Sequence, residues 1–113
     1  MNSTKSTDYE IYKVLMSPQA VIDTQQIYEY ILVRFFSKDS ARKIKDLILK
    51  KIDNLNYMPY RFKECIKDSG IRSVRASNYL IIYNVNEKSK EVYIQRIVYC
   101  RIDIDELLNK CDA

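Results

Sequence analysis

Apolar residues recur at helical spacing in a segment that begins near Ser17-Pro18 and runs to about Phe36. Serine favours the N-cap position. Proline suits the first helical position, because its missing N–H would lack a partner there in any case. The positions that recur at this spacing are Ala20, Thr24, Ile27, Tyr28, Ile31, Leu32 and Phe35. The pattern predicts an amphipathic helix.

A second segment repeats the helical pattern directly afterwards. Ser37 is a suitable N-cap, and Pro59 marks the far limit because the residue before a proline is biased toward extended backbone. The apolar stripe is Ala41, Ile44, Leu47, Ile48, Ile52 and Leu55. The opposite face is basic, with Arg42, Lys43, Lys45, Lys50 and Lys51. Since the link between the two helices is very short, we expect an antiparallel helical hairpin.

Four further segments are rich in the β-branched and aromatic residues that favour strands. They are residues 9–16 (YEIYKVLM), 71–76 (IRSVRA), 79–86 (YLIIYNVN) and 92–99 (VYIQRIVY). The polar run Glu87-Lys88-Ser89-Lys90 predicts a hairpin turn between the last two strands. Gly70 is the only glycine in the chain and indicates a turn before residue 71.

The predicted order is β-α-α-β-β-β, followed by a short helix over residues 103–110. A helical hairpin and a strand meander pack most simply as two layers, which predicts an α+β fold. The hairpin would cover one face of a small, mainly antiparallel sheet and leave the other face open. The length of 113 residues supports one core, so we expect a single domain over 9–113 after a flexible leader over 1–8.

Strict alternation along the last strand predicts which side chains share a face. One set is Ile97, Tyr99 and Arg101, and the other is Ile94, Arg96 and Val98. We interpret Arg96 as structural, paired with a carboxylate on one of the helices. A bulge near Cys100 would reverse the face to which Tyr99 belongs.

The net charge of +4 is unevenly distributed. Residues 1–60 carry nine basic and seven acidic side chains, a net charge of +2. Residues 61–101 carry nine basic and four acidic side chains, +5, and residues 102–113 carry one and four, −3. The basic second half indicates a polyanion or an acidic protein as partner.

The absence of histidine removes several reaction classes. Ser–His–Asp hydrolysis, Cys–His proteolysis and paired-histidine nuclease chemistry are excluded. The spacing of Cys65, Cys100 and Cys111 matches no zinc motif, so we expect no metal and no cofactor, and reduced thiols. No apolar run is long enough to cross a membrane and none is typical of a signal peptide, which predicts a cytoplasmic protein.

Taken in order, these segments resemble the RelE/ParE superfamily of bacterial toxins. The resemblance starts at the strand–SPxA–helix opening that leads from Tyr12 to Ala20. It continues through residues 55–61 (LNYMPYR), 70–75 (GIRSVR), 78–85 (NYLIIYNV) and 93–103 (YIQRIVYCRID). It covers roughly residues 9 to 108, nearly the whole expected domain.

The resemblance implies a toxin that is neutralised by a cognate antitoxin, whose C-terminal segment wraps around it. RelE-like members cut mRNA in the ribosomal A site, whereas ParE-like members inhibit DNA gyrase. In a nuclease, Arg75 and Arg101 would clamp phosphate and Tyr99 would stack on a base or donate a proton. The residues expected to bind the target or the antitoxin are Arg72, Arg75, Tyr79 and Arg101. No small-molecule substrate and no membrane partner are expected.

The chain departs from the RelE-like pattern where a nuclease needs its charged groups. RelE-like members usually carry an arginine directly after the aromatic residue of the Tyr79 strand, and this chain has Leu80. A lysine pair is replaced by Ile71 and Ser73, and residues 104–108 hold no tyrosine or histidine. Because general acid–base groups commonly contribute ~10²–10⁴-fold each, these losses favour a ParE-like toxin.

Two alternatives stay open. One is ribosome-dependent mRNA cleavage through Arg72, Arg75, Tyr99 and Arg101. The other is a non-enzymatic, inactivated toxin that serves only as a binding module. In each case we expect an apolar helix or strand of the antitoxin to dock on the open sheet face and the hairpin groove. Acidic residues of the antitoxin would then meet Arg72, Arg75 and Arg101.

Overall fold

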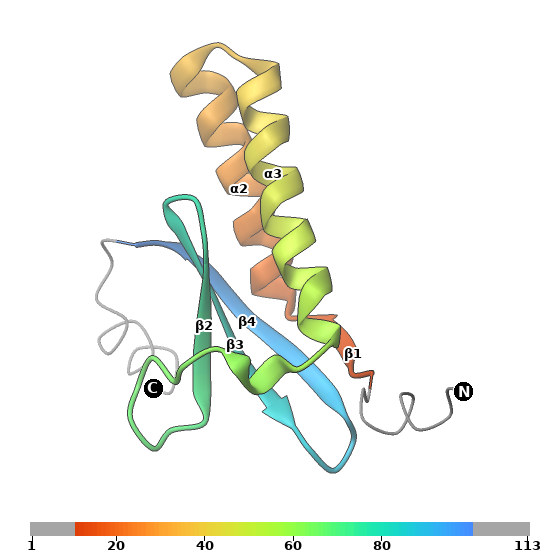
Figure 1. Ribbon diagram of the computed structural model, residues 1–113. Coiled ribbons are helices and arrows are strands. Elements are labelled where there is room, and N and C mark those ends of the chain that lie inside the picture. The colour runs from red at the N-terminus through yellow and green to blue at the C-terminus, as the bar shows by residue number, and fades with distance from the viewer. Residues whose placement is uncertain (1–10, 101–113) are drawn as a thin grey trace.

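The computed structural model describes residues 11–100, which form two layers (Figure 1). The elements are β1 (Lys13–Met16), α2 (Pro18–Phe35), α3 (Lys38–Asp53), η1 (Asn54–Asn56), η2 (Pro59–Arg61), β2 (Ile71–Ala76), β3 (Tyr79–Asn86) and β4 (Glu91–Tyr99). The α2–α3 hairpin packs on one face of a four-stranded sheet, so the predicted α+β fold is confirmed. The predicted leader over 1–8 and the predicted helix over 103–110 lie outside the described residues. No helix between residues 11 and 100 is long and apolar enough to cross a bilayer.

The sheet has the strand order β1-β4-β3-β2. β1 pairs with β4 in parallel, and the other two pairs are antiparallel. The first strand is shorter than predicted and begins at Lys13. Ile11 instead forms an isolated bridge with Tyr57, and the Tyr12 N–H donates to the Asn56 carbonyl at 2.8 Å. Ile11 and Tyr12 therefore pair with the loop after α3 rather than with β4.

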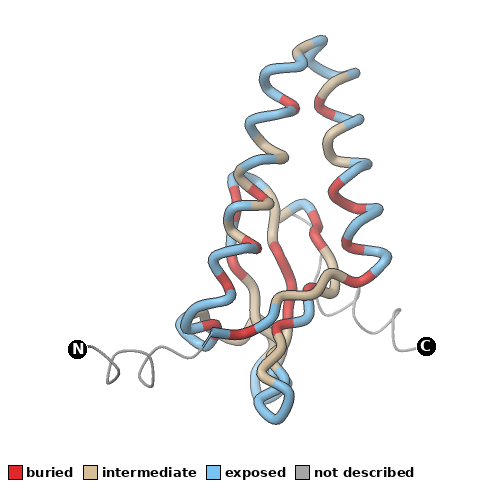
Figure 2. Tube along the Cα trace, turned by 90° about the vertical axis from the view of Figure 1, so that its right-hand side faces the viewer, coloured by how far each residue is buried: buried red, intermediate tan, exposed pale blue. Residues whose placement is uncertain are grey.

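Both helices begin at the serine caps that the sequence predicts. The Ser17 hydroxyl accepts a hydrogen bond from the Ala20 N–H at 2.9 Å, and the Ser37 hydroxyl accepts one from the Ser40 N–H at 3.1 Å. The chain reverses at Phe36, which caps α2 in the left-handed conformation with φ 49°. At this turn the hairpin extends well beyond the sheet (Figures 1 and 2).

The core lies between the hairpin and the covered face of the sheet. Its buried residues are Tyr12, Ala20, Ile48, Ile52, Leu55, Val74, Ala76, Ile81, Tyr83, Val92, Ile94 and Ile97. Tyr83 is the largest fully buried side chain, and its hydroxyl donates to the Pro59 carbonyl at 2.6 Å. Burial raises the pKa of the Tyr83 phenol to about 12, so the hydroxyl remains a donor at neutral pH.

A β-bulge at Gln95 overturns the predicted alternation of the last strand. Ile82 pairs with Arg96 and Tyr83 pairs with Ile94, so the Gln95 backbone has no register partner on β3, although its side chain donates to Asn84 Oδ1 at 2.8 Å. Ile94 and Ile97 consequently both lie in the core, although strict alternation assigned them to opposite faces. One extra residue reverses the facing of everything that follows it.

The sheet face away from the helices is not fully open, contrary to the prediction. Ile82 alternates with the core residues Ile81 and Tyr83, so it belongs to this second face. Ile82 and its near neighbour Val98 are nevertheless buried, while Arg75 and Tyr93 are exposed at the margins. The centre of the second face is thus apolar and removed from water.

Candidate functional site

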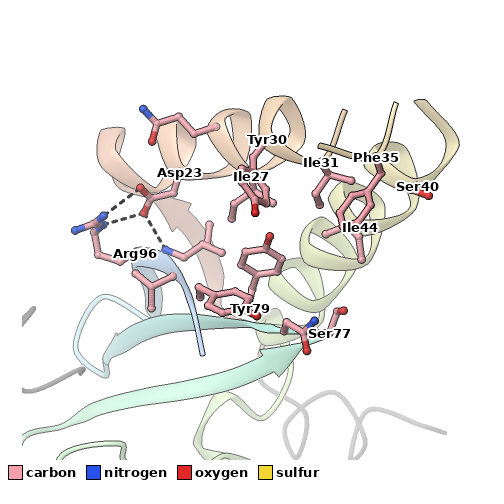
Figure 3. Close-up of a pocket in the computed structure, with 15 residues that line it drawn as sticks. Asp23, Ile27, Tyr30, Ile31, Phe35, Ser40, Ile44, Ser77, Tyr79 and Arg96 are labelled. Atoms are coloured by element: carbon pink, nitrogen blue, oxygen red, sulfur yellow. Dashed lines mark hydrogen bonds and ion pairs between the residues drawn. The ribbon is translucent and has the colours of Figure 1, made fainter. Parts of the chain in front are cut away.

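A pocket of about 700 Å³ opens where the helical hairpin leaves the sheet (Figure 3). α2 and α3 form one wall, and the β2–β3 turn with the end of β4 forms the other. Its apolar lining includes Ile27, Tyr30, Phe35, Ile44, Tyr79 and Tyr99. A concave, mainly apolar surface with few polar groups is the usual form of a binding site.

Tyr79 and Tyr99, two predicted site residues, lie together in this pocket. They are register partners on β3 and β4, and their rings meet edge to face with centroids 5.7 Å apart. In Figure 3 Tyr30 on α2 lies across the pocket from Tyr79. Burial, followed by the neighbouring phenols of Tyr30 and Tyr99, raises the pKa of Tyr79. The Tyr79 phenol is therefore protonated at neutral pH, and the three rings offer apolar surface with polar edges.

An ion pair between Asp23 and Arg96 closes one end of the pocket. The sequence analysis predicted that Arg96 pairs with a helix carboxylate, but it did not identify Asp23. Asp23 on α2 is 5% exposed, and its carboxylate accepts from Arg96 Nε at 2.8 Å and from an Arg96 terminal nitrogen at 3.2 Å. It also accepts from the Ile97 N–H at 3.0 Å and the Gln19 side chain at 3.0 Å. The prediction that Arg96 pairs with a helix carboxylate is confirmed.

The same contacts hold the bulge in place. The Ser17 hydroxyl donates to the Gln95 carbonyl at 2.7 Å, while Asp23 binds the backbone of Ile97. Two side chains from the first turns of α2 thus satisfy backbone groups on either side of the bulge. A buried carbonyl or N–H without such a partner would cost about 1–3 kcal/mol. Asp23 could have been identified from the sequence, because it is a carboxylate on the apolar stripe of the first helix, between Ala20 and Ile27.

Arg75 belongs to the second face of the sheet. It lies between the core residues Val74 and Ala76 and pairs with Leu80, so its side chain points away from the face that carries Tyr79 and Tyr99. Its Nε donates to the Ser77 carbonyl at 2.8 Å. The structure therefore does not gather Arg75 and Tyr99 into one constellation.

The positions where RelE-like toxins carry cations share that second face. Ile71, Ser73 and Leu80 all alternate with core residues and line up beside the buried Ile82. Phosphate binding and charge stabilisation need cationic or hydrogen-bonding groups at such a centre. At these three positions the chain provides two aliphatic side chains and one hydroxyl, and Arg75 is a cation on the same face.

Arg72 has a structural role in holding a loop. Its terminal nitrogen donates to the Phe62 carbonyl at 2.6 Å and to the Tyr60 carbonyl at 3.4 Å. Its guanidinium also lies 5.1 Å from the centre of the Tyr60 ring, as in a cation–π contact. Arg101, the remaining predicted site residue, lies outside the described residues.

A separate cluster joins the β3–β4 turn to the first strand and the η2 loop. Glu87 accepts from the Tyr60 hydroxyl at 2.7 Å and the Tyr12 hydroxyl at 2.9 Å, and it pairs with Lys90. The bonds from Lys90, then from Tyr60 and Tyr12, lower the pKa of Glu87 to about 2. Burial, together with the Glu87 bond, raises the pKa of Tyr60 to about 12. The cluster lies away from the pocket and is explained by the packing of these three segments.

The fold and the pocket define a small protein with a helical hairpin on a mainly antiparallel sheet, a form shared with solved toxin structures. The chain superposes on the chromosomal ParDE system of P. aeruginosa with a TM-score of 0.69 at 18% identity, over 80% of this chain and 97% of that one. It also matches the RelBE2 complex of Mycobacterium tuberculosis (TM-score 0.57, 20% identity, 79% and 98% covered). A third match is the RelE–RelB complex of Pyrococcus horikoshii (0.56, 24%, 82% and 99%). At these identities the likeness establishes the fold alone.

The sequence itself supplies the family. Residues 14–104 match the family described as "ParE toxin of type II toxin-antitoxin system, parDE". No curated protein matches the sequence. Because the family match spans most of the chain, this protein belongs to the ParE toxin family of type II toxin–antitoxin systems.

Proposed function

We propose that this protein is a ParE-like toxin that inhibits DNA gyrase in the cytoplasm and is neutralised by a cognate antitoxin. Family membership supports the general class of toxin. The observation that favours gyrase over mRNA is the character of the second sheet face. Ile71, Ser73 and Leu80 occupy the positions of the RelE-like cations and surround a buried Ile82.

The chemistry of metal-free RNA cleavage explains why this observation carries weight. The 2′-hydroxyl must lose a proton, the charge on phosphorus must be stabilised, and the leaving oxygen must gain a proton. The candidates Arg75 and Tyr99 lie on opposite faces of the sheet, which argues against joint action on one phosphate. A toxin that works by binding needs no such set of groups.

The antitoxin part of the proposal is supported by the solved relatives. The M. tuberculosis RelBE2 structure is a toxin–antitoxin complex, and the P. horikoshii structure is a RelE–RelB complex. In this protein the hairpin pocket is the apolar concave surface to which an antitoxin segment would bind.

Induced expression in growing cells tests the proposal. We expect growth arrest with filamentation and damaged DNA, while total mRNA remains intact. Purified protein should reduce the supercoiling activity of gyrase or trap cleaved DNA, and should leave translation in a cell extract unchanged. Rapid loss of translation with cut mRNA would instead establish the RelE-like activity. A wild-type protein without toxicity would leave the inactivated binding module.

A further inference from the structure

α2 carries two stripes of residues on nearly opposite sides. The inner stripe, turned toward the core, is Ala20, Thr24, Ile27 and Ile31. The second, called here the outer stripe, is shifted by two positions and consists of Ile22, Gln26, Glu29 and Val33, with Phe36 at the C-cap. Because each residue of an α-helix turns the chain by about 100°, a shift of two positions leads to the far side of the helix. All five residues of the outer stripe are exposed.

Both ends of the outer stripe are apolar. Ile22 is 47% exposed and Val33 is 70% exposed. Phe36 is 93% exposed and adopts the left-handed conformation (φ 49°), which glycine or asparagine usually fills at a helix C-terminus. Neither the exposure of Phe36 nor its backbone strain helps a single chain to fold. A contact outside the chain explains both.

The spacing of the outer stripe indicates what kind of element covers it. Its members follow one another at intervals of four, three, four and three residues. This is the heptad spacing at which the contact positions of two helices meet in a coiled coil. From Ile22 to Phe36 the stripe runs for about 21 Å, which is about four helical turns. The partner of this stripe is therefore another helix.

The polar middle of the stripe is complementary to itself in one arrangement. When two α2 helices run antiparallel about a two-fold axis at the middle of the stripe, Ile22 of each copy meets Val33 of the other. Gln26 then lies opposite Glu29, so each amide donates to a carboxylate of the other copy. A parallel pair would oppose the two Glu29 carboxylates, which repel each other. Within the chain Glu29 accepts only a long bond on exposed surface, from the Gln25 side chain at 3.3 Å.

The composition of the two helices favours α2 over α3 for such a contact. α2 has three charged side chains, and one of them, Asp23, is already paired with Arg96. The exposed side of α3 is crowded with charges, among them Arg42, Lys43 and Lys50. Bringing two copies of α3 together would place these cations near one another, whereas the outer stripe of α2 brings together apolar ends and a neutral–acidic pair.

We propose that two copies of this chain associate through the outer stripes of their α2 helices, packed antiparallel about a two-fold axis. The dimer covers the exposed side chains of Ile22, Val33 and Phe36. Of the outer stripe, Gln26 alone also lines the pocket, so the pocket remains open on the other side of α2. A single helix pair of this length is a small interface, which predicts a dissociation constant of about 1–100 μM. The dimer does not depend on the proposed inhibition of gyrase.

Sedimentation equilibrium of the purified chain in reducing buffer tests the dimer. The wild-type protein should change from monomer to dimer between about 1 and 100 μM. Val33→Lys places two charges in the apolar contacts of each dimer and should weaken association by about tenfold or more. Asp46→Asn changes the net charge equally, but on exposed α3 surface, and should associate within about twofold of wild type.

Phe36→Gly separates a contact between copies from a role in folding. Glycine adopts the left-handed conformation without strain, so this variant should unfold at an equal or higher temperature than wild type. It should nevertheless associate about tenfold more weakly, because it loses an apolar anchor. Circular dichroism at concentrations where the chain is monomeric measures the unfolding temperature.

Disulfide cross-linking tests the antiparallel register. The double variant Ile22→Cys/Val33→Cys should form a covalent dimer on mild oxidation, since the register brings these two positions within reach of a disulfide. Val33→Cys alone should cross-link no more than wild type, whose own three cysteines set the background.

Three results would overturn the proposal. The first is a wild-type chain that stays monomeric up to about 1 mM. The second is a dimer whose strength changes with neither Val33→Lys nor Phe36→Gly, since it would use another surface. The third is cross-linking of Val33→Cys alone as efficient as that of the double variant, which would show parallel helices. Growth arrest by the chain is measured separately, so failure of the dimer and failure of the toxin function are distinguishable.

Discussion

The two helices of the hairpin distribute their apolar residues differently, although they have similar lengths and pack side by side. α3 has one buried stripe, which includes Ala41, Ile48 and Ile52, and a lysine-rich outer face. α2 carries apolar residues on more than one side, and the exposed ones include Ile22 and Val33. A surface helix normally keeps its apolar residues on one stripe and its polar residues on the other.

This difference shows that folding explains where the apolar residues of α3 lie, whereas it does not explain the exposed apolar residues of α2. α2 connects to the sheet through Ser17 and Asp23, which use polar atoms rather than apolar area. Its exposed apolar residues run from Ile22, next to the attachment at Asp23, to Phe36 at the turn, and include Tyr30 in the pocket. An exposed apolar surface of this kind is typical of a site that a protein partner covers.

The largest effect should come from substituting a buried residue of α3, whereas substituting an exposed apolar residue of α2 should have little effect. Ile48 is fully buried, so Ile48→Ala should lower the free energy of unfolding by about 2–5 kcal/mol through lost contacts and the cavity left behind. Val33→Ala on α2 should change it by less than about 0.5 kcal/mol. Urea unfolding followed by circular dichroism measures both. Equal losses would mean that α2 contributes to the fold as α3 does, and the comparison would fail.

The polar attachment of α2 should give the next largest effect. Asp23→Ala removes the ion pair with Arg96 and the acceptor of the Ile97 N–H, which should cost about 2–4 kcal/mol, somewhat reduced because Arg96 is 23% exposed. Glu29→Ala, an exposed carboxylate of the same helix, is the matched control and should cost less than about 0.5 kcal/mol. Similar unfolding curves for the two variants would show that the ion pair does not hold α2 on the sheet.

Much of this architecture follows from local sequence. The serine caps, the turn at Gly70 and the bounds of β2 and β3 depend on neighbouring residues, and the structure confirms them, whereas β1 is shorter than predicted. The bulge at Gln95 depends on Ser17 and Asp23, which lie more than 70 positions away. Two consecutive polar residues, Gln95 and Arg96, inside an apolar strand were a local sign of it.

The candidate site was less predictable than the fold. Tyr79 and Tyr99 were named from the sequence and do meet, because antiparallel register places them opposite each other. Arg75 was grouped with them on the basis of resemblance, and the alternation of β2 assigns it to the other face. The pocket itself depends on how far the hairpin extends past the sheet. Nothing in the pattern of a single helix fixes that distance.

Substitution of the two N-cap serines should give a smaller difference in stability between the helices. Ser37 only caps α3, so Ser37→Ala should cost about 1 kcal/mol. Ser17 caps α2 and also donates to the Gln95 carbonyl, so Ser17→Ala should cost about 2 kcal/mol. The difference between the two unfolding free energies measures how strongly the start of α2 supports the bulge. A Ser37 variant as unstable as the Ser17 variant would contradict this role.

The smallest expected effect is a pH dependence of the unfolding free energy that arises from Glu87. Lys90, Tyr60 and Tyr12 hold the pKa of Glu87 at about 2, below its usual 4.5. The folded state then binds fewer protons than the unfolded state between about pH 4.5 and pH 2, so stability from this cluster is complete above that range and is lost as pH falls through it. Glu87→Gln should flatten this part of the stability profile measured by urea unfolding, with Glu29→Gln as the exposed control. A profile that is equally steep in both variants would place the acid sensitivity elsewhere, and the α2–α3 comparison would have to be repeated at each pH. If Glu87 accounts for the acid sensitivity, differences in unfolding free energy between α2 and α3 variants above pH 5 reflect packing and not this cluster.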